Sequence, residues 1–398
     1  MIFRVVNEGR MQQVRDLWTY SFEKPGTAFY DYYFQEYCGK NNMVVGGFEE
    51  VNKWERLRTM VHINPYRLRL RGQELLVPYL VGVATAPEAR GRHCLEELLD
   101  TTFEILRAQE CSFVTLMPIY AGIYLPYGFA YTYYRHKYEG SITMFKTLPT
   151  SSSLRMEREP LTKELLTPLY ARLTEKYNGL PIRTDFQWQK LLAVHSGEGV
   201  QAVVAYNEVG PVGYMLYTLN EGTLTIIELL ASEVIVRNSL LKYASGHESE
   251  AKRLLWLAPA EDKAYMQLAD QANSGSVQPF MMARCIDARR ALALLAKPLP
   301  EQGQLILLLT DEQIPRNNHL LSLSWDNGPL KVKSTVDQED FKIPMAAFTQ
   351  LFFGTFSGQE LLEEGLLSSS LTGEQLQEKL ALLDQLLPKA LTFNNEYF

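Results

Sequence analysis

The pattern of apolar and polar positions changes its period many times along the chain. Short runs rich in β-branched residues, bounded by glycine, proline or charged residues, predict strands. Segments whose apolar residues recur every three or four positions predict helices with one buried face. Both kinds of segment alternate from end to end, so the pattern predicts a protein of mixed α and β structure.

The stretch 81–129 is the most informative part of this pattern. Residues 81–85 form a β-branched and small-residue run that predicts a buried strand, which Pro87-Glu88 ends. Residues 113–117 predict a second strand, which Pro118 ends. A helix is predicted between the two strands, because apolar residues recur there at helical spacing. They are Leu95, Leu98, Leu99, Phe103 and Leu106.

The junction between the first strand and the helix carries Arg90-Gly91-Arg92. A helix N-terminus presents unpaired backbone N–H groups and about half a positive charge, which together attract phosphate oxygens. Two arginines add fixed charge suited to a pyrophosphate, and glycine lets the backbone approach closely. A basic turn can also be an ordinary surface turn that lies in water. These residues alone therefore leave both a phosphate-binding turn and a solvated turn open.

Two parts of this stretch resemble the GNAT acyltransferases. Arg90-Gly91-Arg92, after Ala86-Pro87-Glu88-Ala89, resembles the acetyl-CoA motif Arg/Gln-x-x-Gly-x-Gly/Ala, with His93 and Leu95 in its two glycine positions. The segment from Ile123 to Phe129 resembles the Tyr-x-x-x-Gly-Phe turn more closely. The resemblance implies that acetyl-CoA is bound as co-substrate by the strand and the basic turn. The implied residues are Val81, Val83, Ala84, Arg90, Gly91, Arg92, His93 and Cys94.

Two further folding units are predicted beyond the first. Residues 147–154 are polar and contain proline, so we expect a domain boundary there. Residues 161–257 repeat the order of helices, strands, helix and strand, but without a counterpart of the basic turn. We therefore expect domains at 1–148, 149–283 and 284–398, with no cofactor in the second.

The three parts together resemble the Eis (enhanced intracellular survival) group of N-acetyltransferases over essentially all 398 residues. The resemblance implies a mixed α+β architecture. Tandem GNAT folds, each a mixed central sheet with flanking helices, precede a sterol-carrier-protein-like α+β domain. The resemblance also implies a homo-oligomer, for which a hexamer is one expected form. Two other segments carry it: Arg284-Cys285-Ile286-Asp287 and Asn394-Asn395-Glu396-Tyr397-Phe398.

The Eis resemblance also implies a direct acyl transfer. In that group the terminal carboxylate is the base and a tyrosine of the turn is the acid. Carried over, these are the carboxylate of Phe398 and the hydroxyl of Tyr124, with Tyr127 as the alternative acid. The acceptor is then a small primary amine, either aminoglycoside-like or a lysine side chain.

Residues 12–37 are unusually aromatic, and Pro25-Gly26 divides them into two predicted helices. Such helices bury aromatic faces against a sheet, and walls of ligand pockets are aromatic as well. We assign Trp18 and Phe22 to the wall of the acceptor pocket and Asp31 to attraction of the amine.

Residues 54–71 alternate basic and apolar positions. The alternation indicates a face whose arginines lie in water, and contact with the 3′-phosphate of the nucleotide is the alternative. Residues 74–80 predict one further strand after it.

Composition narrows the class of protein. A formal net charge of −7 argues against a general nucleic-acid binder. No run reaches the ~18–20 apolar residues of a membrane span, and the start shows no secretory pattern, so we expect a cytoplasmic protein. The four cysteines form no CxxC pair and the six histidines lack ligand spacing, so no metal is expected.

Two functions follow from these observations. The first is an acetyl-CoA-dependent N-acetyltransferase in which the amine attacks the thioester directly. The second is a protein that binds a lipid or another apolar ligand and whose acetyltransferase domain is vestigial, since His93 replaces a glycine of the cofactor motif.

Overall fold

The computed structural model describes residues 1–271, 275–295 and 302–396. The chain forms two compact units, and both are discontinuous in sequence. The first comprises Met1–Thr132, Asn178–Ile182 and Phe280–Phe398, and the second comprises Tyr133–Tyr177 and Arg183–Pro279. Strand β8 (Ala130–Ser141) leads out of the first unit, and β15 (Ser276–Cys285) leads back into it.

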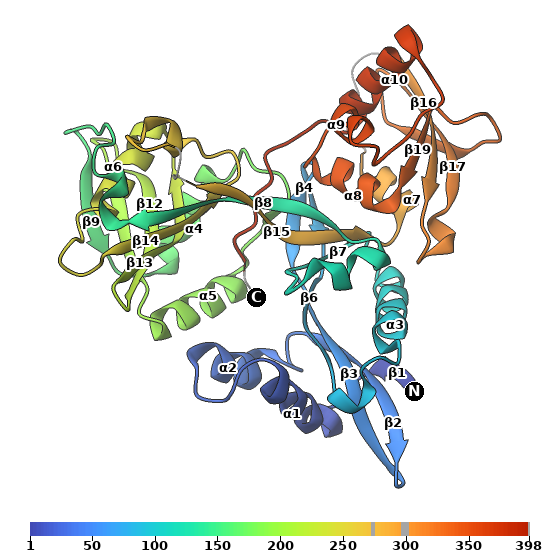
Figure 1. Ribbon diagram of the computed structural model, residues 1–398, viewed down its shortest axis with the longest axis horizontal. Coiled ribbons are helices and arrows are strands. Elements are labelled where there is room, and N and C mark those ends of the chain that lie inside the picture. Colours follow the sequence, from blue (N-terminus) through green and yellow to red (C-terminus); the bar gives the residue numbers. More distant parts are fainter. Residues whose placement is uncertain (272–274, 296–301, 397–398) are drawn as a thin grey trace. The chain divides into compact units, whose positions relative to one another are not determined.

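A mixed sheet forms the centre of the first unit. Its strands lie in the order β1 (Ile2–Val5), β2 (Met43–Val51), β3 (Trp54–Asn64), β6 (Tyr79–Thr85), β7 (Phe113–Leu116) and β15. The first four are antiparallel, whereas β6 and β7 are parallel. The crossover between them is α3 (Cys94–Ala108), which buries the predicted apolar face (Figure 1). The predicted strand–helix–strand unit is therefore confirmed.

The predictions around β6 need one correction. A single strand over residues 74–80 was expected. Instead β5 (Gln73–Leu76) ends before Val77-Pro78, and a new strand, β6, begins at Tyr79 and continues to Thr85. Proline lacks the N–H that a strand ladder needs, so it separates the two strands.

β6 and β7 pair over only two residues. Tyr79 pairs with Thr115 and Leu80 pairs with Leu116, but β6 continues. Among the described residues, 81–85 therefore have no strand partner on that edge. An unpaired edge offers backbone N–H and C=O groups to an extended ligand.

The other edge of β6 contains a β-bulge. The register shifts between the pairs that β6 makes with Met60 and His62 of β3, so Gly82 and Val83 lie opposite Val61. Gly82 has φ +58°, a backbone conformation that glycine adopts readily. Bulges re-aim side chains and often border functional sites.

The aromatic N-terminal segment folds into two helices, as predicted. These are α1 (Met11–Ser21) and α2 (Ala28–Tyr32), followed by a π-helical turn over Tyr33–Tyr37. Pro25-Gly26 lies between the helices. One face of α1 is buried through Val14, Leu17 and Trp18.

The second unit repeats the plan of the first. Its strands lie in the order β8, β14 (Arg253–Pro259), β13 (Thr223–Ala231), β12 (Pro211–Asn220), β11 (Gln201–Tyr206) and β9 (Arg155–Glu159). β13 and β14 are parallel and are joined by α6 (Val234–Ala244), in the same way that α3 joins β6 and β7. The two other helices are α4 (Lys163–Leu173) and α5 (Asp185–Gly197).

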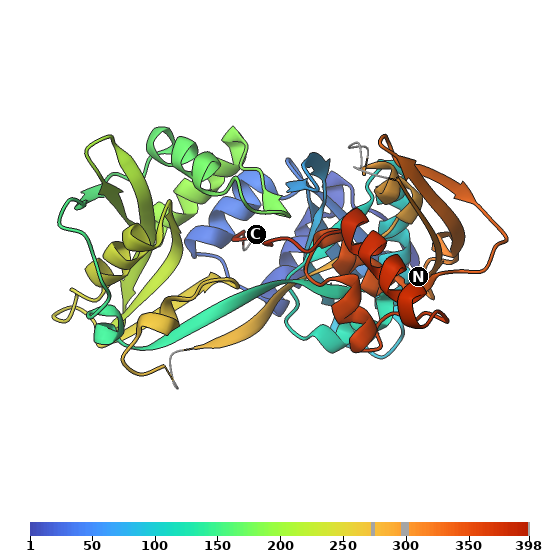
Figure 2. The same ribbon diagram turned by 90° about the horizontal axis from the view of Figure 1, so that it is seen from above.

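The C-terminal part of the first unit is a separate four-stranded sheet with helices. The strands lie in the order β18 (Lys331–Ser334), β17 (His319–Asp326), β16 (Gln302–Thr310) and β19 (Phe341–Pro344). Figure 2 shows the red helices packed on one side of the orange strands. The helices are α7 (Ala288–Ala293), α8 (Met345–Phe353), α9 (Gly358–Glu363) and α10 (Gly373–Leu386).

Arg71 corrects the expectation that the arginines of residues 54–71 lie in water. It follows β4 (Arg67–Leu70), which pairs with β5 and with the short β10 (Leu180–Pro181). Its guanidinium donates to the carbonyl oxygens of Leu351 at 2.6 Å, Phe352 at 2.8 Å and Pro388 at 2.6 Å. Because arginine binds the exposed carbonyls at a helix C-terminus well, Arg71 ties the end of α8 to the small sheet of β10, β4 and β5.

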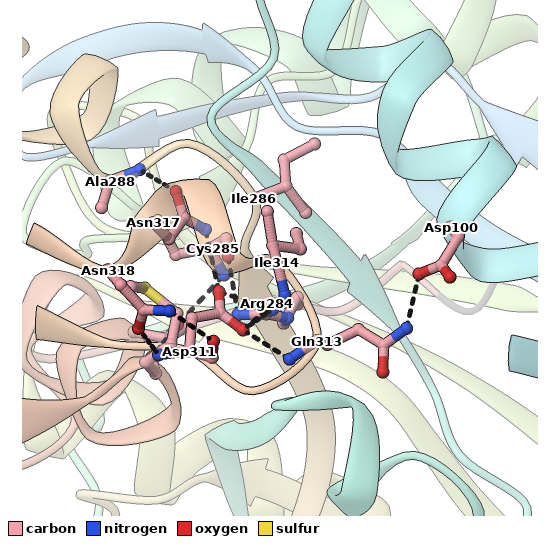
Figure 3. Close-up of polar contacts among 12 residues, drawn as sticks. Asp100, Arg284, Cys285, Ile286, Ala288, Asp311, Gln313, Ile314, Asn317 and Asn318 are labelled. Atoms are coloured by element: carbon pink, nitrogen blue, oxygen red, sulfur yellow. Dashed lines mark hydrogen bonds and ion pairs between the residues drawn. The ribbon is translucent and has the colours of Figure 1, made fainter.

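A buried ion pair joins the end of β15 to the C-terminal sheet (Figure 3). The Arg284 guanidinium donates to Asp311 Oδ1 at 2.7 Å and Oδ2 at 2.8 Å. Asp311 also accepts from the backbone N–H groups of Gln313 and Ile314 and from the side-chain amide of Asn317. The network therefore satisfies the Asp311 carboxylate, whereas Arg284 Nε is buried without a partner among the described residues.

Breaking this pair should destabilise the first unit strongly. Arg284→Met leaves the Asp311 carboxylate buried without a cation, and we expect a loss of about 3–5 kcal/mol in the free energy of unfolding. The control is Arg316→Met, which removes an exposed pair with Glu104 and should cost at most ~1 kcal/mol. Urea unfolding measures both, and equal losses would contradict a special role for Arg284.

Candidate active site

The basic turn lies between β6 and α3, as the sequence predicted. Gly91 has φ +72°, and a methyl group added there would meet no atom within 4 Å. His93 is the N-cap residue of α3, has φ +55° and makes no capping hydrogen bond with its side chain. The exposed backbone of the turn and the N-terminus of α3 are therefore available to an anion.

The two arginines of the turn differ in their surroundings. Arg90 is exposed and donates from Nε to the Thr85 carbonyl at 3.2 Å. Arg92 instead donates to Glu49 Oε1 at 2.7 Å, and Arg58 binds the same carboxylate. The hydrogen bond from Arg92 contributes most to lowering the pKa of Glu49, and the hydrogen bond from Arg58 contributes next. Arg90 is thus the cation of the turn without a carboxylate partner among the described residues.

Tyr124 lies between two short 3₁₀ turns, Ala121–Ile123 and Leu125–Tyr127. Its side chain belongs to the buried cluster that Val83 of β6 packs against, and its ring meets Phe129 edge-on at 5.8 Å. Burial raises the pKa of Tyr124 to about 12. The phenol therefore keeps its proton at neutral pH.

Tyr127, the alternative acid, is less buried. Burial raises the pKa of Tyr127, and the charges of Glu96 and Asp100 raise it further. Both tyrosines are therefore protonated near neutral pH, and their pKa shifts do not choose between them.

An aromatic cluster surrounds Trp18. Its ring stacks on Tyr33 at 5.1 Å and lies 5.0 Å from both Phe22 and the His62 ring. The structure therefore brings together Trp18 and Phe22, two of the three residues assigned to the acceptor. Gly82 completes the contact, since a methyl group added there would lie 2.4 Å from the Trp18 ring.

Asp31, the third assigned residue, lies elsewhere. Its Oδ1 accepts from the Gly26 N–H at 3.2 Å, and the side chain borders an open groove of about 660 Å³. Asp16 and Arg15 also line this groove, whereas Trp18 and Phe22 do not. Phe34 lines the groove and also meets the Trp18 ring edge-on at 5.5 Å, so Asp31 borders a groove next to the aromatic cluster.

His62 is a candidate functional residue that the sequence analysis missed. It is fully buried on β3, and its Nδ1 lies 2.9 Å from the Tyr33 hydroxyl and 3.7 Å from Cys38 Sγ. Burial lowers the pKa of His62 to about 3, so the ring is neutral. A single histidine in an apolar strand belongs to no motif or residue spacing that would mark it as functional. Only the fold places His62 beside Gly82.

The C-terminal tail docks on the first unit. Phe398, the assigned base, lies outside the described residues. Before it, the Leu391 carbonyl accepts from the Asn178 N–H at 2.8 Å, and Asn394, Asn395 and Glu396 are buried.

The last described residue of the tail approaches the aromatic helices. Burial is the main cause that raises the pKa of Tyr37. Electrostatic interaction with the nearby Tyr32 and Glu396 raises this pKa further. Tyr37 stacks on Tyr33 at 5.4 Å. Glu396 is thus within electrostatic range of the π-helical turn whose Tyr33 contacts Trp18 and His62.

Comparison with known protein families identifies three domains in the chain. The profile of the GNAT acetyltransferase domain matches residues 3–132, and a second profile of the same description matches residues 179–285. That of the sterol carrier protein domain matches residues 286–393. The chain is a tandem GNAT protein with a C-terminal sterol carrier protein domain. Its GNAT domains place it among the N-acetyltransferases, which use an acyl-CoA as co-substrate.

Solved structures share this three-part fold over their whole length. A probable N-acyltransferase from Enterococcus faecalis V583 superposes with a TM-score of 0.87 at 20% identity, covering 100% of this chain and 99% of the other. A GCN5-related N-acetyltransferase from Anabaena variabilis gives 0.82 at 18% identity, and Eis1 from Mycobacterium abscessus gives 0.75 at 15%, both with complete coverage of each chain. No curated protein matches the sequence.

The residues of the first GNAT domain fit an acyl-CoA. The open edge of β6, the bulge at Gly82 and the turn at Gly91 together supply backbone N–H groups, and Arg90 supplies a cation. At the matching place in the second GNAT domain, Ser232-Glu233 lies between β13 and α6, and Glu233 is the N-cap. A carboxylate there repels phosphate, so the first domain fits the co-substrate better.

The described residues also settle two smaller points. They contain no group of three or more His, Cys, Asp or Glu side chains arranged to hold a metal ion. None of their helices combines the length and apolar character needed to cross a membrane.

Gly82→Ala should destabilise the domain and disturb the aromatic cluster. The new methyl group would clash with the Trp18 ring, and φ +58° strains any other residue, so we expect a loss of about 1–3 kcal/mol. Gly140→Ala is the control, because its methyl group would meet Met144 Sδ at an ordinary 3.5 Å. Urea unfolding with tryptophan fluorescence reports both, and equal stability of the two variants would contradict the close approach.

Stability should depend on pH through His62. The folded state holds this ring neutral down to about pH 3, whereas the unfolded chain binds a proton near 6.5. Acid therefore favours the unfolded state, and wild type should lose up to ~1.4 kcal/mol per pH unit relative to His62→Gln as pH falls below 6.5. Parallel urea unfolding from pH 7.5 to 4.5 tests this, and a constant difference between the two proteins would contradict it.

Proposed function

We propose that the chain transfers an acetyl group from acetyl-CoA to a small primary amine in its first GNAT domain. The observation that carries the proposal is the continuity of one surface. It runs from the bulge at Gly82, along the unpaired edge of β6, to Arg90 and the N-terminus of α3. An extended thioester with a diphosphate matches that order of groups.

Backbone groups of Val81, Val83 and Ala84 would hold the extended arm of the co-substrate. Arg90, Gly91, Arg92, His93 and Cys94 would receive the diphosphate, with Arg92 shared with Glu49. His93 supplies its backbone N–H in place of the glycine of the motif. The first domain would then extend to about residue 148, the second to 283 and the third to 398, as expected from the sequence.

The proposed base is the carboxylate of Phe398. An amine is protonated near pH 7, so a base must remove its proton before attack. The tail supports this role as far as it is described, because its buried residues lead to Glu396 near Tyr37. In the transfer the C–N bond forms and the C–S bond breaks. One amine proton passes to the carboxylate before attack, and a second leaves the nitrogen after attack and restores the proton that the acid gives to the thiolate.

The proposed acid is Tyr124, which would protonate the departing thiolate. Its proton is retained because burial raises the pKa to about 12, and its cluster includes Val83 at the bulge. Backbone N–H groups of β6 would stabilise the negative charge on the carbonyl oxygen.

The acceptor would enter beside the aromatic cluster. Trp18 and Phe22 would wall its apolar part, and the Asp31 groove would attract the other amines of a polycation such as an aminoglycoside. The proposal also places the protein in the cytoplasm and assembles it as a homo-oligomer, for which a hexamer is one form.

Tyr124→Phe should lower kcat about 100-fold or more, because loss of a general acid costs that order of rate. Tyr127→Phe, the matched control, should keep kcat within about threefold. Removal of Phe398 should lower kcat by a similar factor, because the terminal carboxylate then moves to Tyr397. Release of coenzyme A thiol with a panel of amines measures the rates.

Calorimetry with acetyl-CoA separates chemistry from binding in these variants. Affinity should stay near that of wild type in all three. A normal kcat in Tyr124→Phe with a loss in Tyr127→Phe would exchange their roles. No binding by wild type would contradict an acetyltransferase and favour the apolar-ligand binder.

A further inference from the structure

One nitrogen beside the bulge has no hydrogen-bond partner. His62 Nε2 is buried and unbonded among the described residues, although the ring is fully enclosed. A buried polar group without a partner costs about 1–3 kcal/mol. Such a group is retained where a bound molecule supplies the missing partner.

The neighbours of His62 decide which of its nitrogens carries the proton. The Tyr33 hydroxyl accepts from Asn42 Nδ2 at 2.9 Å, so its own proton is free to be donated. His62 Nδ1 at 2.9 Å is a closer acceptor than Asn64 Oδ1 at 3.3 Å. With Nδ1 accepting, the neutral ring carries its proton on Nε2, and the unpartnered group is an N–H donor.

This donor lies at the acyl end of the proposed co-substrate site. A methyl group added to Gly82 would lie 3.1 Å from His62 Cδ2, the ring carbon bonded to Nε2. Gly82 is the first residue of the bulge and lies within the open stretch 81–85 of β6. Trp18 lies beside both Gly82 and the His62 ring, at 5.0 Å between ring centroids, and His62 is fully buried, so the site is shielded from water.

We propose that His62 is a further catalytic residue, whose Nε2–H donates a hydrogen bond to the carbonyl oxygen of the thioester beside Gly82. The inference rests on the proposed function, because it places the acyl group at the bulge. A fixed donor in a dry site stabilises the charge that develops on this oxygen without reorganisation. A neutral imidazole suits this role because it donates without giving up its proton.

The direct test is NMR of the full chain with ¹⁵N-labelled histidine. The chain has six histidines, and His62→Gln identifies the signal of residue 62. The free protein should show the Nε2–H form at pH 7. Acetonyl-CoA keeps a carbonyl but carries a methylene group between it and the sulfur, so it cannot transfer an acyl group and should shift the Nε2 resonance. CoA, which lacks the carbonyl, should shift it much less.

Kinetics of two variants supply the second readout. His62→Met removes the donor and should lower kcat about 100-fold, as loss of one such donor does. His62→Gln keeps an N–H near the same place and should retain at least tenfold more activity than the methionine variant. Calorimetric affinity for acetyl-CoA should be unchanged in both.

The outcomes separate this inference from the proposed function. If CoA and acetonyl-CoA both bind but shift the Nε2 resonance equally, or if both variants keep wild-type kcat, the role of His62 is overturned alone. If neither ligand binds the wild-type chain, the proposed function fails and this inference fails with it.

Discussion

The buried pair between Arg284 and Asp311 is the interaction on which the first unit depends. Two charges removed from water are stable only when every polar atom finds a partner. Asp311 meets that condition through a bidentate arginine, two backbone N–H groups and an amide. The pair therefore fixes the loop after β16 against the end of β15.

The same arginine reaches the turn that carries the proposed acid. Gly128, which has φ +73°, lies so close that an added methyl group would be 2.9 Å from Arg284 Cζ. The turn containing Tyr124 thus rests on a guanidinium held by the C-terminal sheet. Arg71 adds a second tie, because it binds carbonyls of α8 and of Pro388 at the start of the tail. The C-terminal part of the chain therefore supports the turn that carries Tyr124.

Much of the fold could be predicted because its signals are local. The helix at 94–108 follows from its apolar spacing, and the split between α1 and α2 follows from Pro25-Gly26. The partners of β15 and Arg71 could not be predicted in this way. β15 pairs with Phe113–Leu116, and Arg71 binds a carbonyl 281 residues away. No local pattern encodes contacts over such a separation.

Some residues of the candidate site could likewise be predicted from local motifs, and others could not. Arg90, Gly91 and Tyr124 lie in motifs that a resemblance can locate. His62 has no motif, and its importance comes from Tyr33 and Gly82, which reach it from other elements. Asp31 and Trp18 belong to different helices, α2 and α1, and only Asp31 borders the open groove.

We propose that only the first of the two GNAT domains holds the co-substrate, because the turn before α3 carries Arg90 whereas the shorter turn before α6 has Glu233 as its N-cap residue. Isothermal titration of the full chain with acetyl-CoA tests this most directly. The account predicts one molecule bound per chain, and Arg90→Glu should abolish most of the heat. Two molecules per chain, or one that is insensitive to Arg90→Glu, would contradict it.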